Sequence, residues 1–241
     1  MGKVSMVVFD LSGTTVSDEN AVAESLYAAA QEAGLDATLE EITVKVGTNK
    51  IHLYQSLIAR SQGRIVGIED LEKQDDPASH AQAMAIFHRY SEIMIDYYRR
   101  GVRAIDGAEA AFAWCQERGI KVATDTGFHR DVTEAIMEGL GWLRRGLVDL
   151  AVDVEHVGGV GRPAPFMIHY AMRQLDVQNV RQVIKVGDTP ADMLEGWNAG
   201  CSGVVGVLSG PVPLVHWGKY WHTHIIPSVK ELPEVIERDF L

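Results

Sequence analysis

The amino-acid sequence predicts a doubly wound α/β fold with a second, helical domain inserted after its first strand. From residue 101 onward, short apolar runs rich in β-branched residues alternate with amphipathic helical patterns. One further apolar run, residues 4–9, stands near the start of the chain. The residues between, 16–100, carry helical patterns only. We therefore expect an α/β core from residues 1–15 and 101–241, and a helical cap from residues 16–100.

The expected strands are short and almost continuously apolar. This pattern is typical of parallel strands that helices cover on both faces. In chain order the runs are VSMVVF (4–9), IKVAT (120–124), VDLAV (148–152), QVIKVG (182–187), GVVGV (203–207) and HIIP (224–227). Between them, amphipathic stripes predict helices around residues 108–115, 132–140 and 168–175. We expect these runs to form one parallel sheet.

The expected cap carries three amphipathic stripes at helical spacing. Asp76 followed by Pro77 predicts a helix start inside it, with Asp75 just before. Arg99-Arg100-Gly101 is expected to form the hinge that returns the chain to the core. The stripes are Val22, Leu26, Ala30 and Ala33; then Ile51, Tyr54, Leu57 and Ile58; then Met84, His88, Ser91, Ile95 and Tyr98.

Composition and charge exclude several classes of protein. The 241 residues include 22 Lys+Arg and 33 Asp+Glu, which gives a formal charge of −11. This balance argues against nucleic-acid binding, since phosphate backbones need a basic face, but it allows a small anionic substrate. No apolar run approaches the roughly 18 residues of a membrane helix, and the first residues do not resemble a signal peptide. Cys115 and Cys201 form no CxxC pair, so we expect a cytoplasmic protein without membrane partners.

Polar and charged residues follow the expected core strands. In a doubly wound sheet, ligands bind beyond the carboxyl ends of the strands. Carboxylates, hydroxyls and an arginine at this edge are suited to holding Mg²⁺ and to neutralising a phosphoryl group. The four segments are FDLSGTT (9–15), TDTGF (124–128), GRPAP (161–165) and GDTPAD (187–192).

In this order the four segments resemble the motifs of the haloacid dehalogenase (HAD) superfamily, and within it those of the phosphonatase and phosphonatase-like hydrolases. The resemblance spans nearly the whole chain, because this group inserts a helical cap at the same place. It implies a hydrolase in which Asp10 takes the phosphoryl group as an aspartyl phosphate. It also implies that Asp188 and Asp192 hold Mg²⁺ together with Asp10 and the main-chain carbonyl of Ser12.

The resemblance implies the phosphate contacts as well. Arg162 would bind the phosphate and offset the carboxylates, because its fork suits bidentate oxygen contacts. Thr126 would hydrogen-bond a phosphate oxygen, although Thr124 or Thr14 could make this contact instead. The expected substrate ligands are Ser12, Gly13, Thr126, Gly127 and Arg162.

Ser12 is the most informative departure from the superfamily pattern. Most phosphatases of the superfamily carry a second Asp at this position as a general acid and base, a role that serine cannot fill. Phosphonatases lack this acid too, because their carbon leaving group is stabilised by an imine with a cap lysine. The segment VGTNKI (46–51) resembles the one that carries that lysine, so Lys50 is the Schiff-base candidate. A lysine on a cap helix can equally be a solvated charge.

Other positions differ from the phosphonatase pattern. Asp125 replaces a small neutral residue, and His52 is adjacent to the position of an expected histidine. These changes bear on the substrate and leave phosphoryl transfer at Asp10 intact. Lys185, inside an expected strand, is interpreted as structural or as lying at an edge. Asn20, Val46, Leu53 and Phe128 stand where the group carries Cys, Met, His and Tyr.

Three functions follow as hypotheses. The first is C–P bond hydrolysis of a phosphonoacetaldehyde-type substrate through an imine at Lys50. The second is a phosphomonoesterase similar to phosphoglycolate phosphatases, acting on an easily displaced leaving group. The third, from another class, is a regulatory protein that binds phosphate with little turnover. The resemblance also suggests a homodimer formed through the cap.

Overall fold

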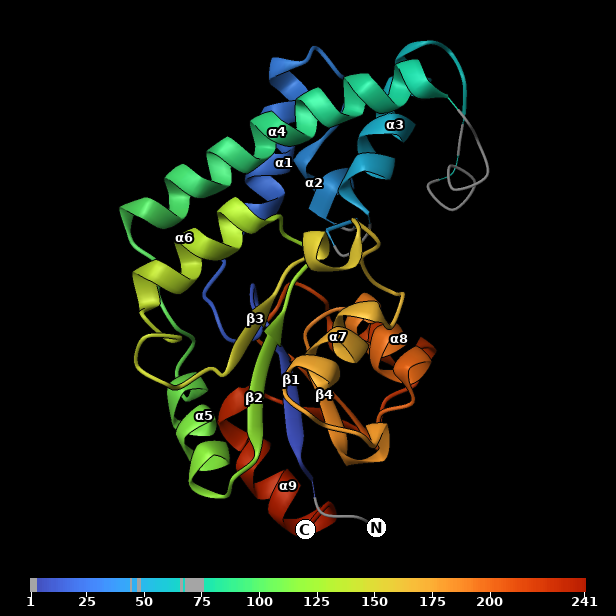
Figure 1. The fold of residues 1–241 in the computed structure, drawn as a ribbon. Helices are drawn as coiled ribbons and strands as arrows, with labels where there is room; N and C mark the ends of the chain where they lie inside the picture. The colour runs from blue at the N-terminus through green and yellow to red at the C-terminus, as the bar shows by residue number, and fades with distance from the viewer. Residues whose placement is uncertain (1–3, 44, 47–48, 66, 68–75) are drawn as a thin grey trace. The chain divides into compact units, whose positions relative to one another are not determined.

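The computed structural model describes residues 4–43, 45–46, 49–65, 67 and 76–241. The chain forms two compact units (Figure 1). The first, here called the core unit, comprises Met1–Asp18 and Gly101–Leu241. The second, the helical unit, comprises Glu19–Arg100.

The core unit contains a parallel sheet, and the predicted α/β fold is confirmed. Among the described residues the strand order is β3-β2-β1-β4-β5-β6, and each neighbouring pair is parallel. The chain runs outward from β1 in both directions, so β1 and β4 flank the point where a doubly wound sheet binds its ligand. The strands are β1 (Met6–Asp10), β2 (Lys121–Asp125), β3 (Leu150–Val152), β4 (Val183–Gly187), β5 (Gly203–Val207) and β6 (His224–Ile226).

Strand register brings the polar ends of three strands to one level. Asp10 pairs with Asp125 of β2, and Phe9 pairs with Val186 of β4. The residue after Val186, Gly187, therefore ends β4 beside Asp10, and Asp188 follows it directly. The register explains why segments far apart in the sequence meet at this edge.

Helices cover both faces of the sheet, as the burial of every residue of β1 requires. Met6 and Val8 belong to an apolar cluster with Met167 of α7 and Met193 of α8. Figure 1 shows α7 and α8 on this side, while α5 and α9 pack together. The helices and 3₁₀ turns are α5 (Ala108–Glu117), α6 (Arg130–Leu140), η2 (Val154–Val157), α7 (Phe166–Gln174), η3 (Val180–Gln182), α8 (Pro190–Ala199), η4 (Leu214–Lys219), η5 (Val229–Glu231) and α9 (Leu232–Asp239).

Aromatic rings stack between β1 and the following helices on the other face. The Phe9 ring meets Phe112 of α5 edge-on, with centroids 5.0 Å apart. Phe112 in turn meets Trp142 edge-on, also at 5.0 Å. Such edge-to-face pairs add to the free energy gained from burying the rings. They fix the strand that ends in Asp10 against the helical layer.

The helical unit packs α4 against α1 and α3. Tyr54 of α3 donates a hydrogen bond to the main-chain oxygen of Leu26 in α1 over 3.2 Å. The main-chain N–H of Ser79 donates to Asp76, which caps α4 as predicted, while Asp75 lies outside the described residues. The helices are α1 (Ala21–Glu32), α2 (Leu39–Thr43), α3 (Lys50–Ser61) and α4 (Pro77–Arg100).

The predicted stripe on α4 was partly wrong. His88 is exposed, whereas Phe87 and Tyr90 are buried. The helix turns these rings inward because they remove more apolar surface from water than the predicted neighbours would. The buried face is Ser79, Ala83, Ile86, Phe87, Tyr90, Ser91, Met94 and Tyr98. Neither α4 nor another helix in the described part of the chain is long and apolar enough to cross a membrane.

Candidate active site

The four polar segments meet at the carboxyl edge of the sheet in the core unit. Arg162, from the loop before α7, places its Nη2 atom 2.7 Å from Asp10 Oδ1. Its Nη1 atom lies 2.9 Å from Asp192 Oδ1 in the first turn of α8. Asp188 accepts a hydrogen bond from Thr14 Oγ1 over 2.9 Å. Residues at the ends of β1 and β4, in α8 and in the loop before α7 thus share one site.

A tight turn after β1 shapes the nucleophile end of this site. The hydroxyl of Thr15 donates to the main-chain oxygen of Asp10 over 2.7 Å, and the N–H of Gly13 donates to Val16 over 2.9 Å. Gly13 has φ +86°, a left-handed conformation that favours glycine. A Cβ there would also lie 2.8 Å from Asp188 Cγ. The turn therefore depends on glycine at position 13, both for its backbone and for the space given to Asp188.

The loop after β5 closes on the same turn. Ser209 donates a hydrogen bond to the main-chain oxygen of Gly13 over 2.7 Å. The adjacent Gly210 approaches Asp188 so closely that a Cβ would lie 2.5 Å from Asp188 Cγ. Sequence reasoning missed Ser209 and Gly210. Ser209 is 196 positions from Gly13 in the sequence, and the fold of the loop after β5 brings the two residues into contact.

Asp10 and Asp188 are two buried carboxyl groups in direct interaction. Burial, and then the charges of Asp10 and Asp192, raise the pKa of Asp188 well above its ordinary value. Burial also raises the pKa of Asp10, against the opposing effect of Arg162. Carboxyl groups this close are ionised together only when a cation offsets their repulsion. This part of the site therefore fits a divalent metal that prefers oxygen ligands.

Asp192 has both oxygens engaged by the protein. Its Oδ2 atom accepts from the N–H of Thr189 over 3.1 Å and from the hydroxyl of Thr189 over 2.6 Å, which caps α8. Its Oδ1 atom lies 3.1 Å from Lys185 Nζ. A Cβ on Gly187 would overlap this carboxyl group. Carboxyl oxygens of Asp10, Asp125 and Asp192 all lie within 4.8 Å of one another. Arg162 contacts all three of these carboxyl groups, and Lys185 contacts those of Asp125 and Asp192.

A buried ionic layer lies behind Arg162. Asp125 Oδ1 is 2.5 Å from Arg162 Nη2 and is also in contact with Lys185 Nζ. Glu195 Oε2 lies 3.2 Å from Arg162 Nε and 3.2 Å from Lys185 Nζ. The side chains of Asp125, Lys185 and Glu195 are fully buried, and that of Arg162 is 11% exposed. Two cations are thus held among several carboxyl groups.

Opposite pKa shifts accompany this packing. Burial favours the neutral form of Asp125, but Lys185 and Arg162 outweigh it and hold the pKa of Asp125 below its ordinary value. Burial, and then the charge of Asp125, raise the pKa of Glu195 well above its usual range. Despite burial, the surrounding carboxylates raise the pKa of Lys185. The two cations therefore favour the ionised form of Asp125, whereas burial beside Asp125 favours the protonated form of Glu195.

A family comparison gives this arrangement its context. Residues 4–200 match the family model of haloacid dehalogenase-like hydrolases. The chain belongs to this family. The expected membership of the superfamily is confirmed, and the protein is a hydrolase.

Individual relatives refine this assignment. Phosphonoacetaldehyde hydrolase from Bacillus cereus is 32% identical over 215 residues, covering 86% of this chain and 77% of the relative. Among solved structures, a hydrolase from Pseudomonas syringae has a TM-score of 0.77 at 16% identity, with coverage of 98% and 99%. A phosphonoacetaldehyde hydrolase like protein from Oleispira antarctica has a TM-score of 0.71 at 21% identity, with coverage of 98% and 92%. The resemblance to phosphonatases is thus also found over most of the chain.

The threonines of the hydrolase have different surroundings. Thr14 donates to Asp188. Thr124 is buried within β2, one residue before Asp125, so its side chain lies on the opposite face of the strand. Thr126 follows the strand and accepts a hydrogen bond from the N–H of Phe128 over 3.2 Å, which leaves its own hydroxyl proton to donate. Gly127 lies half-buried between them.

Ser12 and Lys50 belong to different units of the hydrolase. The Ser12 hydroxyl oxygen is buried and has no hydrogen-bond partner among the described residues. Lys50 is the first residue of α3 in the helical unit and is half-buried, as is His52. Asn49 caps this helix by accepting from the N–H groups of residues 51 and 52, whereas residues 47 and 48 lie outside the described part of the chain.

Glu195 is the charged residue that sequence reasoning missed, and Lys185 is the one whose surroundings it underrated. Glu195 stands three positions after Asp192, on the same face of α8, and this spacing was the available signal. Lys185 stands among apolar residues of a strand that is buried throughout. A lysine in such a strand requires carboxylate partners.

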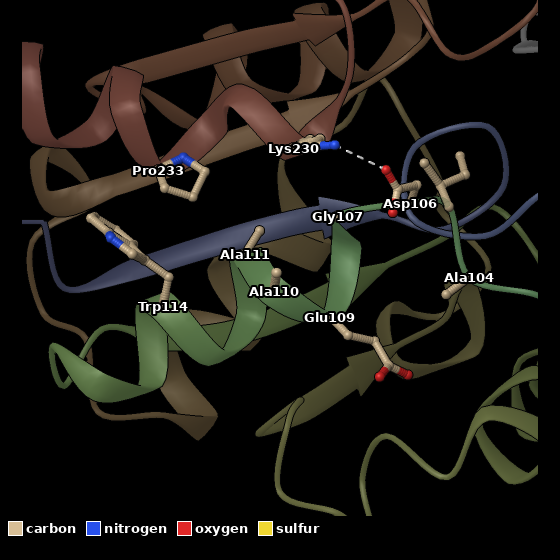
Figure 2. A pocket seen from close by; sticks show the side chains of 10 residues that line it. Ala104, Asp106, Gly107, Glu109, Ala110, Ala111, Trp114, Lys230 and Pro233 are labelled. Atoms are coloured by element: carbon tan, nitrogen blue, oxygen red, sulfur yellow. Dashed lines mark hydrogen bonds and ion pairs between the residues drawn. The ribbon is translucent and has the colours of Figure 1, made fainter.

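A separate pocket in the core unit does not contain the residues predicted to act (Figure 2). It has a volume of about 620 Å³ and lies between the start of α5 and residues of η5 and α9. Lys230 and Asp106 form an ion pair of 3.2 Å at its rim. Glu109 on its wall is already paired with Arg145 at 2.7 Å. The pocket offers no cluster of groups for phosphoryl chemistry.

Proposed function

We propose that the protein hydrolyses the C–P bond of a small phosphonate aldehyde of the phosphonoacetaldehyde type. The observation that carries this proposal is Ser12, a buried hydroxyl at the position where an acid for an alcohol leaving group would stand. A carbon leaving group activated as an imine needs no such acid. The 32% identity to a phosphonoacetaldehyde hydrolase supports the same class of substrate.

In this proposal Asp10 is the nucleophile and Mg²⁺ is the metal. Asp10, Asp188 and the main-chain carbonyl of Ser12 would hold the ion, with Asp192 as the further carboxylate of the set. When bound, Mg²⁺ neutralises charge on the phosphoryl oxygens and the repulsion between the carboxylates. Arg162 orients Asp10 through the contact at Oδ1 and offsets its charge. Thr126 and the N–H group of Gly127 would donate to phosphoryl oxygens. The N–H group of Gly13, the other expected donor, already donates to the main-chain oxygen of Val16.

The amine of Lys50 would form the imine. Its nitrogen adds to the aldehyde carbon, and one water leaves. An Asp10 oxygen then attacks phosphorus, the C–P bond breaks, and its electron pair moves toward the imine nitrogen to give an enamine. Protonation of the carbon and addition of one water release the aldehyde product and Lys50. A second water cleaves the aspartyl phosphate, so the net reaction consumes one water and yields phosphate.

The helical unit would serve as the cap in this reaction. It would bring Lys50 to the substrate bound at Asp10 and exclude bulk water during transfer. The proposed partner is a small cytoplasmic anion, with no role for nucleic acid or membrane. A homodimer formed through the helical unit is part of the same expectation.

Borohydride trapping with phosphonoacetaldehyde tests the proposal. With Mg²⁺ present we expect release of phosphate and aldehyde, and a reduced adduct that peptide mass spectrometry locates at Lys50. Lys50→Arg keeps the charge but cannot form the imine, so it should lose both signals. Lys45→Arg is the matched control, because Lys45 pairs with Glu41 at 3.1 Å and an arginine can keep that pair. No adduct at Lys50 together with no phosphate would defeat the proposal.

A phosphomonoesterase is the second candidate, and two buried residues favour it. Leu53 and Phe128 stand in the apolar interior where phosphonatases carry histidine and tyrosine. A substrate that needs neither polar group would suit these positions. A panel of small phosphomonoesters, phosphoglycolate included, separates the candidates. Phosphate release from an ester that is unchanged in Lys50→Arg would favour the esterase.

A further inference from the structure

The guanidinium of Arg162 contacts two fully buried carboxyl groups behind it, Asp125 and Glu195, and both of these also contact the fully buried Lys185. Asp125, Lys185 and Glu195 are here called the anchor layer. We propose that the anchor layer consists of positioning residues that aim Arg162 at Asp10. This inference rests on the proposed roles of Asp10 and Arg162. It assigns a task to Asp125, which the phosphonatase resemblance leaves without one.

Asp125 fixes the direction of one nitrogen of Arg162. Arg162 Nη2 lies 2.5 Å from Asp125 Oδ1 and 2.8 Å from the main-chain oxygen of Asp125. The same nitrogen lies 2.7 Å from Asp10 Oδ1. Nη2 donates hydrogen bonds to the side-chain and main-chain oxygens of Asp125, whereas its contact with Asp10 is an ion pair. Asp125 therefore fixes this nitrogen at a place where its charge faces Asp10.

Lys185 keeps Arg162 from being drawn into the layer. Its ammonium group is in contact with Asp125, and it lies 3.1 Å from Asp192 and 3.2 Å from Glu195. These three carboxyl groups also contact Arg162. Without Lys185, Arg162 would be the cation left to interact with these carboxyl groups. Their attraction would then draw the guanidinium toward them and away from Asp10.

The origin of Arg162 explains why an anchor is needed. The residue comes from a loop before α7, not from a helix or strand, and its long side chain has many rotamers. A side chain of this kind needs several directional contacts to hold one orientation near a nucleophile. The anchor layer supplies contacts to Nη2 and Nε, and Asp192 supplies one to Nη1. Two hydrogen bonds to Asp125 thus fix the direction of the guanidinium, and ion pairs at Nε and Nη1 hold its charge in place.

Three variants separate a positioning role from a purely structural one. Asp125→Asn and Lys185→Met each remove one charge, and the double variant removes one of each sign. The measurements are the melting temperature, the calorimetric Kd of inorganic phosphate with Mg²⁺, and kcat and KM for phosphate release. Replacing both members of a buried ion pair often restores stability, so the double variant is expected to melt near the wild type. Its phosphate affinity and its kcat should nevertheless stay about tenfold or more below the wild-type values, because Arg162 lacks its anchor.

The control is a double variant of an exposed ion pair in the same unit, Asp106→Asn with Lys230→Met. It should leave the melting temperature near that of the wild type, and Kd, kcat and KM within about twofold of the wild-type values. Recovery of kcat and phosphate affinity along with the melting temperature would overturn the positioning role. The same conclusion would follow if either single variant bound phosphate as the wild type does. A wild type that binds no phosphate also overturns it. If the wild type binds phosphate but does not cleave phosphonoacetaldehyde, the proposed substrate fails, and calorimetry on these variants still decides the role of the anchor layer.

Discussion

Replacing Gly13 with alanine is expected to impair metal binding and turnover, because the new methyl group would take space that the Asp188 carboxyl occupies. The added Cβ would lie 2.8 Å from Asp188 Cγ and 3.2 Å from Gly210 Cα. Carbon atoms in contact are normally about 3.5–4.0 Å apart, so the carboxyl carbon would have to move by roughly an ångström. A displacement of this size at a catalytic site can lower the rate by about 100-fold.

Backbone strain adds a second effect, which two control variants separate from the first. Gly13 has φ +86°, and an alanine in this left-handed region costs about 1–2 kcal/mol. Gly119→Ala carries the same strain at φ +68° but meets nothing within 4 Å. Gly210→Ala has no left-handed φ, yet its Cβ would lie 2.5 Å from Asp188 Cγ. The first control isolates strain, and the second isolates contact with Asp188.

The assay combines calorimetric Mg²⁺ titration, phosphate release and thermal unfolding of the three variants. Gly119→Ala should lose a few degrees in melting temperature and keep its Mg²⁺ affinity and kcat. Gly13→Ala and Gly210→Ala should both lose Mg²⁺ affinity, by about tenfold or more, together with kcat. If Gly13→Ala differs from Gly119→Ala in none of these quantities, the steric argument around Asp188 is refuted.

Three further predictions concern pH, thiols and packing. Burial and the carboxylates beside it raise the pKa of Asp188, so its contribution to metal-free stability is fully present below about pH 4 and is lost as pH rises through the raised pKa. Since Mg²⁺ must displace that proton, the rise in melting temperature caused by Mg²⁺ should grow between about pH 5 and 8, and a constant rise would contradict this. Burial raises the pKa of Cys115 and of Cys201 to about 12. A thiol reagent at about pH 8 should therefore label both cysteines slowly in the folded protein and rapidly in denaturant. Rapid labelling of the folded protein would contradict the burial of these thiols. Trp142→Ala should lower the free energy of unfolding by about 3–5 kcal/mol in urea titrations, because the buried indole packs on Phe112, and a loss under about 1 kcal/mol would show that the packing contributes little.

The fold was predictable because its strands carry a strong local signal. Runs such as GVVGV at 203–207 are apolar on both faces, and this run forms β5 with the predicted bounds. The stripe on α4 was harder to predict, since Ser91 and Tyr98 fit more than one helical face. Burial of Phe87 and Tyr90 decides the face, and that depends on the neighbouring helices.

The candidate site was predictable from the residues at the ends of strands, and for Arg162 and Asp192 through the resemblance of their segments to the superfamily motifs. Asp10 ends β1 and Asp188 follows β4, so strand order alone brings them to one edge. The contact of Lys185 with Asp125 is different, because these residues are 60 positions apart and lie on strands separated by β1. Sequence periodicity gives neither strand order nor the partner of a buried charge. The buried ionic layer therefore became visible only in three dimensions.

Phosphate release from phosphonoacetaldehyde by the wild type and by Asp10→Asn tests the central claim most directly. The asparagine keeps the size of the side chain but removes the nucleophile, and it also removes repulsion with Asp188, so the variant should melt at or above the wild-type temperature. With Mg²⁺ present, the wild type should release phosphate, and Asp10→Asn should be slower by roughly 10³-fold or more. A folded Asp10→Asn protein that keeps more than about a tenth of the wild-type rate would contradict transfer through Asp10.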